Sequence, residues 1–222
     1  MTHPTKQYAD RVEAGRALAA LLKPYAVENP AVVGLPRGGV VVAAEIARRL
    51  GCELDVIIAG KLRAPSNPEL AIGAITEDGL AFVNYPVIRS LHIKNGYVEE
   101  EKRQRLEAVR ERLKSYRAIK KKVPLRDRTV ILADDGLATG ATMMSAVHAA
   151  KAEGAAKIIV AVPGGPEDTV SAITEMDGVA QVICPLTPAL FYAVSQIYAD
   201  FRQVEDSEVL TILKEFAARE RI

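Results

Sequence analysis

The chain has 222 residues, of which 49% are hydrophobic and 26% are charged; these are the proportions of an ordinary globular protein and exclude a disordered chain. Its 29 Lys and Arg residues nearly balance its 28 Asp and Glu residues, and the formal net charge of +1 excludes a general electrostatic attraction for nucleic acid. No stretch approaches the ~18 consecutive apolar residues of a membrane-spanning helix, which excludes an integral membrane protein.

The first part of the chain predicts a helix followed by a strand–helix–strand unit. Residues 6–22 carry apolar side chains at helical spacing. Residues 31–35, an apolar run between two prolines, predict a buried strand. Residues 38–50 predict a helix that ends at Gly51, and residues 54–59 predict a second strand. A strand, a helix and a strand within about thirty residues form the unit from which parallel sheets are built.

The middle of the chain departs from this alternation. Residues 62–69 contain two prolines and predict a mobile loop, while residues 71–76 and 80–84 predict a hairpin around a Glu-Asp-Gly turn. Residues 97–119 predict a long charged helix with a narrow apolar stripe and opposite charges at helical spacing. We interpret this helix as the main part of an arm, at about residues 96–122, that packs on the domain or on a second subunit.

The second half of the chain repeats the alternation. Strands are predicted at residues 129–133, 157–162 and 181–184, and helices at residues 140–153 and 167–176. With the first two strands, these predict an α/β fold around a doubly wound, mostly parallel five-stranded sheet, whose ligands bind beyond the carboxyl ends of the strands. We expect a single domain over residues 1–222, with its core at about residues 30–184.

The stretch from Val130 to Met143 is the most informative of the chain. A predicted strand ends there in two adjacent carboxylates, Asp134 and Asp135, and a loop of small residues leads into a helix. Small residues let backbone N–H groups surround an anion, and the start of a helix adds a partial positive charge. Two carboxylates would repel that anion unless they face a neutral group, such as the neighbouring hydroxyls of a sugar. The stretch therefore predicts a site for a five-carbon sugar phosphate.

The same stretch resembles the phosphoribosyl pyrophosphate signature of the type I phosphoribosyltransferases, in which hydrophobic residues precede two acids, a short linker, Thr-Gly and Thr. The resemblance implies that Asp134 and Asp135 hold the ribose hydroxyls and that the loop holds the 5′-phosphate. The implied phosphate-binding residues are Ala138, Thr139, Gly140, Ala141 and Thr142. An Asp pair after a strand also occurs in phosphoacceptor domains and metal-dependent phosphatases, but these do not need the Ala-Thr-Gly-Ala-Thr run.

A second loop supports the resemblance. Residues 34–39 follow the first predicted strand, where the family places its pyrophosphate loop. The resemblance implies that Arg37, Gly38 and Gly39 bind the pyrophosphate and that the bond between Pro36 and Arg37 is cis. The alternative is that the two glycines simply begin a helix.

A third element follows the second predicted strand. The family often carries a flexible loop there, which brings basic residues to the pyrophosphate. By this resemblance, Lys61 is a pyrophosphate-binding residue, and Arg63 is a second candidate. The alternative is an ordinary surface lysine at the end of a strand.

The implied reaction transfers a phosphoribosyl group from 5-phosphoribosyl 1-pyrophosphate to a nitrogenous acceptor and releases pyrophosphate, as in nucleotide metabolism. The implied catalytic residues are Asp134, Asp135, Arg37 and Lys61. The expected cofactor is Mg²⁺, held by substrate oxygens and water rather than by assigned protein ligands. Two alternatives stay open: a non-catalytic regulator that senses phosphoribosyl pyrophosphate or a nucleotide, and a metal-dependent hydrolase using the acid pair.

The acceptor is not identified by these motifs. In the 6-oxopurine branch of the family an acid stands where this chain has Ala138, so the resemblance argues against hypoxanthine and guanine. A hood over the acceptor is expected from the N-terminal helix and from residues 185–222. Phe191, Tyr192 and Tyr198 lie in that segment and can stack on a flat ring, and the alternative is that they simply pack a C-terminal helix. Together with the arm, this hood resembles a group of predicted bacterial phosphoribosyltransferases.

The expected partners are the small-molecule substrates and a second copy of the chain in a homodimer, with no membrane. Nucleic acid is disfavoured as a partner, because its best candidate contact is the short run of lysines at residues 120–122. The polar first ten residues lack the apolar core of a signal peptide. Cys52 and Cys184 form no spaced pair, which argues against disulfides and structural zinc. A cytoplasmic location is therefore expected.

Overall fold

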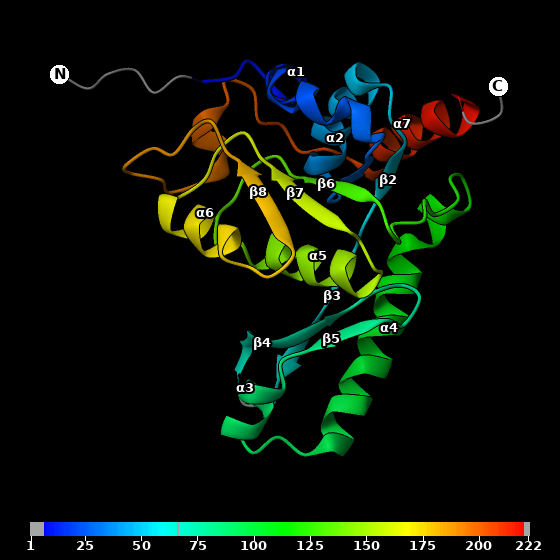
Figure 1. The fold of residues 1–222 in the computed structure, drawn as a ribbon, viewed down its shortest axis with the longest axis vertical. Helices are drawn as coiled ribbons and strands as arrows, with labels where there is room; N and C mark the ends of the chain where they lie inside the picture. The colour runs from blue at the N-terminus through cyan, green and yellow to red at the C-terminus, as the bar shows by residue number, and fades with distance from the viewer. Residues whose placement is uncertain (1–6, 66, 220–222) are drawn as a thin grey trace.

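The computed structural model describes residues 7–65 and 67–219. At its centre lies a five-stranded sheet in the order β2-β1-β6-β7-β8 (Figure 1). The strands are β1 (Ala31–Gly34), β2 (Leu54–Val56), β6 (Thr129–Ala133), β7 (Lys157–Ala161) and β8 (Val179–Ile183). Every neighbouring pair in this sheet is parallel. The doubly wound α/β fold predicted from the sequence is therefore confirmed.

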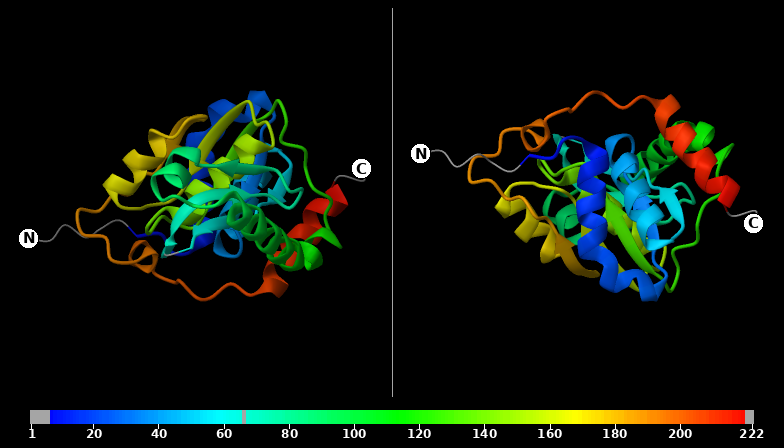
Figure 2. Two further views of the ribbon diagram at one scale, coloured as in Figure 1. Left: turned by 90° about the horizontal axis from the view of Figure 1, so that it is seen from below. Right: turned by 90° about the horizontal axis from the view of Figure 1, so that it is seen from above.

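Helices cover both faces of this sheet. The helices on one face are α1 (Arg11–Leu22), α2 (Gly38–Leu50) and α7 (Asp206–Arg219), and those on the other are α5 (Ala141–Ala152) and α6 (Glu167–Thr174) (Figure 1; Figure 2). Successive strand residues point to opposite faces: Val32 and Ile131 pack with α2, whereas Val33 and Leu132 pack with α5. Burial on both faces explains why these strands are continuous apolar runs.

The first helix is shorter than predicted. It begins at Arg11 rather than at residue 6, because the side chain of Asp10 accepts a hydrogen bond from the N–H of Glu13 and caps the helix there. Lys6 itself lies outside the described residues.

A second, antiparallel sheet stands where a mobile loop was predicted. It consists of β3 (Gly60–Ala64), β4 (Asn67–Ile75) and β5 (Ala81–Val83) in that order. The β4–β5 hairpin was predicted. The prediction of a mobile loop at residues 62–69 is wrong, because Leu62 and Ala64 are both buried, and this alternating burial makes residues 60–64 a strand. Ser66, within that predicted loop, lies outside the described residues. Since β2 ends at Val56, Lys61 lies inside β3 and not directly after the second strand.

The long charged helix is confirmed as α4 (Asn95–Arg117), and it is preceded by the short helix α3 (Tyr85–Ser90). Its apolar stripe packs within the molecule: Val109 and Leu113 contact residues of β2 and α7, and Val98 joins the core of the second sheet. Arg117 near its end pairs with Asp55 of β2 and with Glu77 in the β4–β5 turn. The helix therefore joins the two sheets (Figure 1).

The described residues also form two short 3-10 helices, η1 (Lys23–Glu28) and η2 (Val194–Ile197). Between β8 and α7, the chain passes beside the N-terminal segment, where Tyr8 and Tyr198 form an isolated bridge. Among residues 7–65 and 67–219, no helix combines the length and the apolar character needed to cross a bilayer.

Candidate functional site

The two adjacent carboxylates lie at the carboxyl end of β6, in direct contact with the loop that follows β1. The N–H of Asp135 donates a hydrogen bond of 2.8 Å to Oδ1 of Asp134. A Cβ on Gly38 would lie 1.9 Å from Oδ2 of Asp135, and a Cβ on Gly39 would lie 2.8 Å from Oδ1 of Asp134. A larger residue would overlap with the carboxylates at both positions, so the loop after β1 and the end of β6 lie in direct contact.

Arg11, the first residue of α1, holds Asp135. Its Nε lies 2.7 Å from Oδ2 of Asp135, and its Nη1 donates to the carbonyl of Arg202 at 2.8 Å. The guanidinium also lies over the ring of Phe201, 3.9 Å from the ring centre. Arg11 was not identified from the sequence, because the pair joins residues 124 positions apart and no local motif marks it.

Tyr198 holds the main chain of the same carboxylate residue. Its hydroxyl donates a 2.7 Å hydrogen bond to the carbonyl of Asp135. Burial raises the pKa of this phenol, and the negative charge of Asp135 raises it further. The ring is buried with Tyr8 and stacked with Phe201. Tyr198 therefore packs within the molecule, which was the alternative to stacking on an acceptor, and its hydroxyl is occupied by the carbonyl of Asp135.

The other two aromatic side chains of the expected hood differ from one another. Phe191 is partly buried in the cluster that holds Tyr8 and Tyr198. Tyr192, in contrast, is 80% exposed. Of the three aromatics proposed for the hood, Tyr192 has the most exposed ring.

The environment of Asp134 disfavours its negative charge. Burial raises the pKa of this carboxyl well above its ordinary value, and the neighbouring charge of Asp135 raises it further. A positive charge or a hydrogen-bond donor brought to this carboxyl would favour its ionised form. The carboxylate pair is thus suited to a ligand that supplies hydroxyl donors.

The predicted phosphate loop encloses a small cavity at the start of α5. The cavity has a volume of about 140 Å³ and is lined by residues 136–143, together with Asp134 and Val194. Gly140, with φ +72°, ends the loop, and a Cβ there would lie 2.6 Å from Thr169. Thr139 and Thr142 are exposed, so their hydroxyls are accessible to a ligand. Val194, from η2, closes the cavity and was not identified from the sequence.

The loop after β1 is placed as the sequence analysis expected, with one difference. The bond between Pro36 and Arg37 is cis, as predicted. The guanidinium of Arg37, however, points toward Glu205, with Nη1 3.7 Å from a carboxylate oxygen. The structure thus brings the glycines of this loop to the carboxylates and directs the Arg37 side chain toward the segment before α7.

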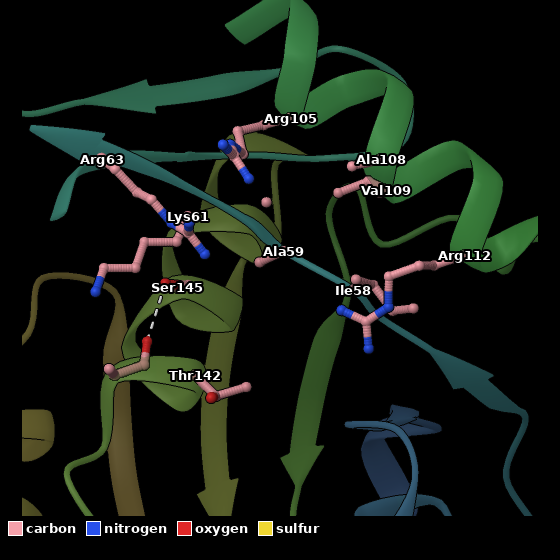
Figure 3. A pocket seen from close by; sticks show the side chains of 12 residues that line it. Ile58, Ala59, Lys61, Arg63, Arg105, Ala108, Val109, Arg112, Thr142 and Ser145 are labelled. Carbon is pink, nitrogen blue, oxygen red and sulfur yellow. Dashed lines mark hydrogen bonds between the residues drawn. The ribbon is translucent and has the colours of Figure 1, made fainter. Parts of the chain in front are cut away.

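Lys61 and Arg63 line a second, larger cavity next to the phosphate loop (Figure 3). It has a volume of about 360 Å³ and lies between β3, α4 and the start of α5. Thr142 lines both cavities. Two arginines of α4, Arg105 and Arg112, also line the larger cavity. They were not identified from the sequence, because α4 carries many charges and its pattern alone does not show which of them face a cavity.

In residues 7–65 and 67–219, no cluster of three or more His, Cys, Asp or Glu side chains is arranged to hold a metal ion. Asp134 and Asp135 are the carboxylates at the site. A metal ion there would therefore take most of its ligands from a bound substrate and from water.

Comparison with known proteins identifies similar chains. The family model described as the phosphoribosyl transferase domain matches residues 5–173. Two proteins of Mycobacterium tuberculosis, named "Putative phosphoribosyl transferase MT0597" (strain CDC 1551) and "Putative phosphoribosyl transferase Rv0571c" (strain H37Rv), are each 43% identical over 209 residues. The match covers 94% of this chain and 46% of each relative, so the chain spans about half their length.

A solved structure, that of TT1426 from Thermus thermophilus, is 40% identical to this chain, with a TM-score of 0.88. That match covers 95% of this chain and 99% of the other. The fold of this chain therefore has an experimental counterpart over most of its length.

Proposed function

This chain belongs to the type I phosphoribosyltransferase family, and from that premise we propose that it transfers the phosphoribosyl group of 5-phosphoribosyl 1-pyrophosphate to a nitrogenous acceptor and releases pyrophosphate. One observation carries the proposal: the glycine loop after β1 packs against Asp134 and Asp135, beside the cavity of the phosphate loop. The contact between these elements supports a single site in which the phosphate loop, the carboxylate pair and the glycine loop bind one donor molecule.

The 5′-phosphate binds in the small cavity. The first residues of α5 line this cavity, and the unpaired N–H groups and partial positive charge of a helix start favour an anion. The hydroxyls of Thr139 and Thr142 donate further hydrogen bonds. The volume of about 140 Å³ suits a group of this size.

The ribose hydroxyls bind at the carboxylates. Asp134 and Asp135 accept hydrogen bonds from neighbouring hydroxyls, and the 2.7 Å contact with Arg11 fixes the orientation of Asp135. Hydrogen bonds from the sugar offset the burial that disfavours the charge of Asp134. The pair thus recognises a diol rather than an isolated phosphate.

The reaction breaks the bond between the anomeric carbon and a pyrophosphate oxygen and forms a bond from that carbon to a nitrogen of the acceptor. Positive charge develops on the sugar and negative charge on the leaving group. The nearby carboxylates stabilise the first, and the N–H groups around Gly38 and Gly39 stabilise the second. Lys61 adds a cation on the side of the leaving group.

Mg²⁺ is the metal ion that we propose for this reaction. It would neutralise charge on the diphosphate, and Asp134 and Asp135 are the protein groups that can contact it or its water ligands.

The main alternative is a regulator that binds the same ligand without turnover and contacts nucleic acid through the lysine run. The structure weakens this alternative, because Lys120 is buried and Lys122 is paired with Asp78 and Glu153. Only Lys121 of the run is exposed. The lysine run therefore presents no basic surface for a nucleic acid backbone.

The test measures pyrophosphate release from phosphoribosyl pyrophosphate and Mg²⁺ with a panel of nitrogenous bases. We expect release with at least one base, and loss of both release and donor binding in the double variant Asp134→Asn with Asp135→Asn. Asp177→Asn, an exposed carboxylate paired with Lys151, is the matched control and should change neither. Full donor affinity in the double variant would overturn the placement of the ribose. Binding without release for any base would favour the regulator.

A further inference from the structure

The larger cavity carries cations from two separate elements. Its lining residues include Lys61 and Arg63 of β3 and Arg105 and Arg112 of α4, and none of them is a carboxylate (Figure 3). The two α4 positions are seven residues apart, which is about two helical turns and places both side chains on the face that borders the cavity. An enclosed group of positive charges is a site for an anion with several negative charges.

The two arginines of α4 are held differently. Nε of Arg105 lies 2.9 Å from Oε1 of Glu101, and the same oxygen accepts a hydrogen bond from the N–H of Arg63. Glu101 therefore fixes Arg105 beside β3. Arg112, in contrast, makes no ion pair or hydrogen bond with any residue in the described part of the chain. Its guanidinium keeps all its donors for a ligand.

The position of Arg112 connects this cavity to the proposed site. Arg112 also lines a smaller cavity of about 60 Å³ that Pro36 and Thr142 border. Pro36 belongs to the loop after β1, and Thr142 belongs to the phosphate loop. Arg112 thus borders the space between the two loops.

We propose that Arg105 and Arg112 form, with Lys61 and Arg63, an anion subsite that takes the diphosphate of the donor and the pyrophosphate product. The inference rests on the proposed function for the identity of the ligand, and it assigns to α4 a binding role beyond packing. Planar guanidinium groups bind phosphoryl oxygens in pairs, which suits them to a diphosphate.

The test uses titration calorimetry with inorganic pyrophosphate and, separately, ribose 5-phosphate, each with and without Mg²⁺. Arg112→Gln and Arg105→Gln should each weaken pyrophosphate binding by about tenfold or more, the effect of losing a hydrogen bond to a charged group. Binding of ribose 5-phosphate should stay within about twofold, because neither arginine lines the small cavity. Arg103→Gln is the matched control: Arg103 pairs with Glu100, lines a different groove and should leave both affinities unchanged.

The outcomes separate this inference from the proposed function. If wild-type protein binds phosphoribosyl pyrophosphate and both variants keep full affinity for it and for pyrophosphate, the subsite is wrong and the function stands. If wild-type protein binds pyrophosphate through the two arginines but binds neither ribose 5-phosphate nor the donor, the arginines are confirmed as a pyrophosphate site, whereas their assignment to the donor and the proposed function both fail. If the variants lose affinity only for an anionic acceptor, the assignment to the diphosphate is overturned. Thermal unfolding of each variant shows whether it is folded.

Discussion

The ring of Phe82 on β5 stacks on the ring of His148 on α5, with centres 3.9 Å apart and planes inclined by 4°. This contact joins the second sheet to the helix whose start carries the phosphate loop. Because β5 pairs with β4 and β4 pairs with β3, the contact helps to fix the sheet that bears Lys61 and Arg63 against α5.

Phe82→Ala should therefore loosen the second sheet. Loss of the stacked pair and of its buried area should reduce the free energy of unfolding by about 1–2 kcal/mol, since Phe82 is only partly buried. Hydrogen exchange of the β3, β4 and β5 amides is the measurement, and faster exchange there than in β6 is expected. Tyr85→Ala, an exposed aromatic in the same region, serves as the control. Unchanged exchange in all three strands would show that other contacts hold the sheet.

Arg11→Gln should reduce both the stability of the fold and the affinity for the donor. The side chains of Arg11 and Asp135 are only 9% and 16% exposed, and breaking such a pair should cost about 2–3 kcal/mol of stability. Donor affinity should fall as well, because Asp135 loses its fixed orientation. Denaturant unfolding and donor titration measure the two effects. Arg16→Gln removes an exposed partner of Glu45 on the same helix and should cost less than about 1 kcal/mol.

Gly38→Ala tests the close contact of the two loops. The added methyl group would overlap with the Asp135 carboxylate, and displacing that side chain should cost about 1–3 kcal/mol. We expect donor affinity to fall with stability. Gly96→Ala, at a position with no atom within 4 Å of the added carbon, is the control and should leave donor binding intact. Normal donor affinity in Gly38→Ala would contradict the contact described here.

Asp134→Asn should stabilise the protein while it abolishes donor binding. Because folding raises the pKa of Asp134, the folded state resists its ionisation, and stability is lost as pH rises from the unfolded pKa toward the folded one. The neutral amide removes this cost and keeps an oxygen for the N–H of Asp135, so unfolding at pH 7 should require about 1 kcal/mol more. At pH values below the unfolded pKa the gain should vanish. A gain of equal size at pH 3 and pH 7 would show another origin.

Local segments of the site were predictable, and contacts between distant segments were not. The run from Asp134 to Thr142 and the loop around Gly38 and Gly39 each lie within a few residues of a strand end, where chain order alone places them at one edge of a parallel sheet. Arg11 reaches Asp135 only through the packing of α1 on α2, which no spacing in the sequence reveals.

The prediction of a loop in place of β3 failed for a different reason. The prolines that border β3 and occur in β4 predict a loop, yet Pro65 lies after the last residue of β3 and Leu62 is fully buried. Packing against the α4 side of the molecule outweighs the local preference for a turn. The placement of Arg105 and Arg112 could not be read from α4 for the same reason, because it depends on where that sheet lies.

The chain leaves the central sheet after β2 and returns to it at β6, and these two strands flank β1. Residues 57–128 are thus an insertion that begins and ends beside one strand, and they carry all four cations of the larger cavity. In the proposed site, the carboxylates, the phosphate loop and the glycine loop belong to the central sheet, whereas the four cations proposed for the leaving group belong to this insertion. Exchanging the insertion between relatives should therefore change the cations around the leaving group and leave the sugar-binding part in place.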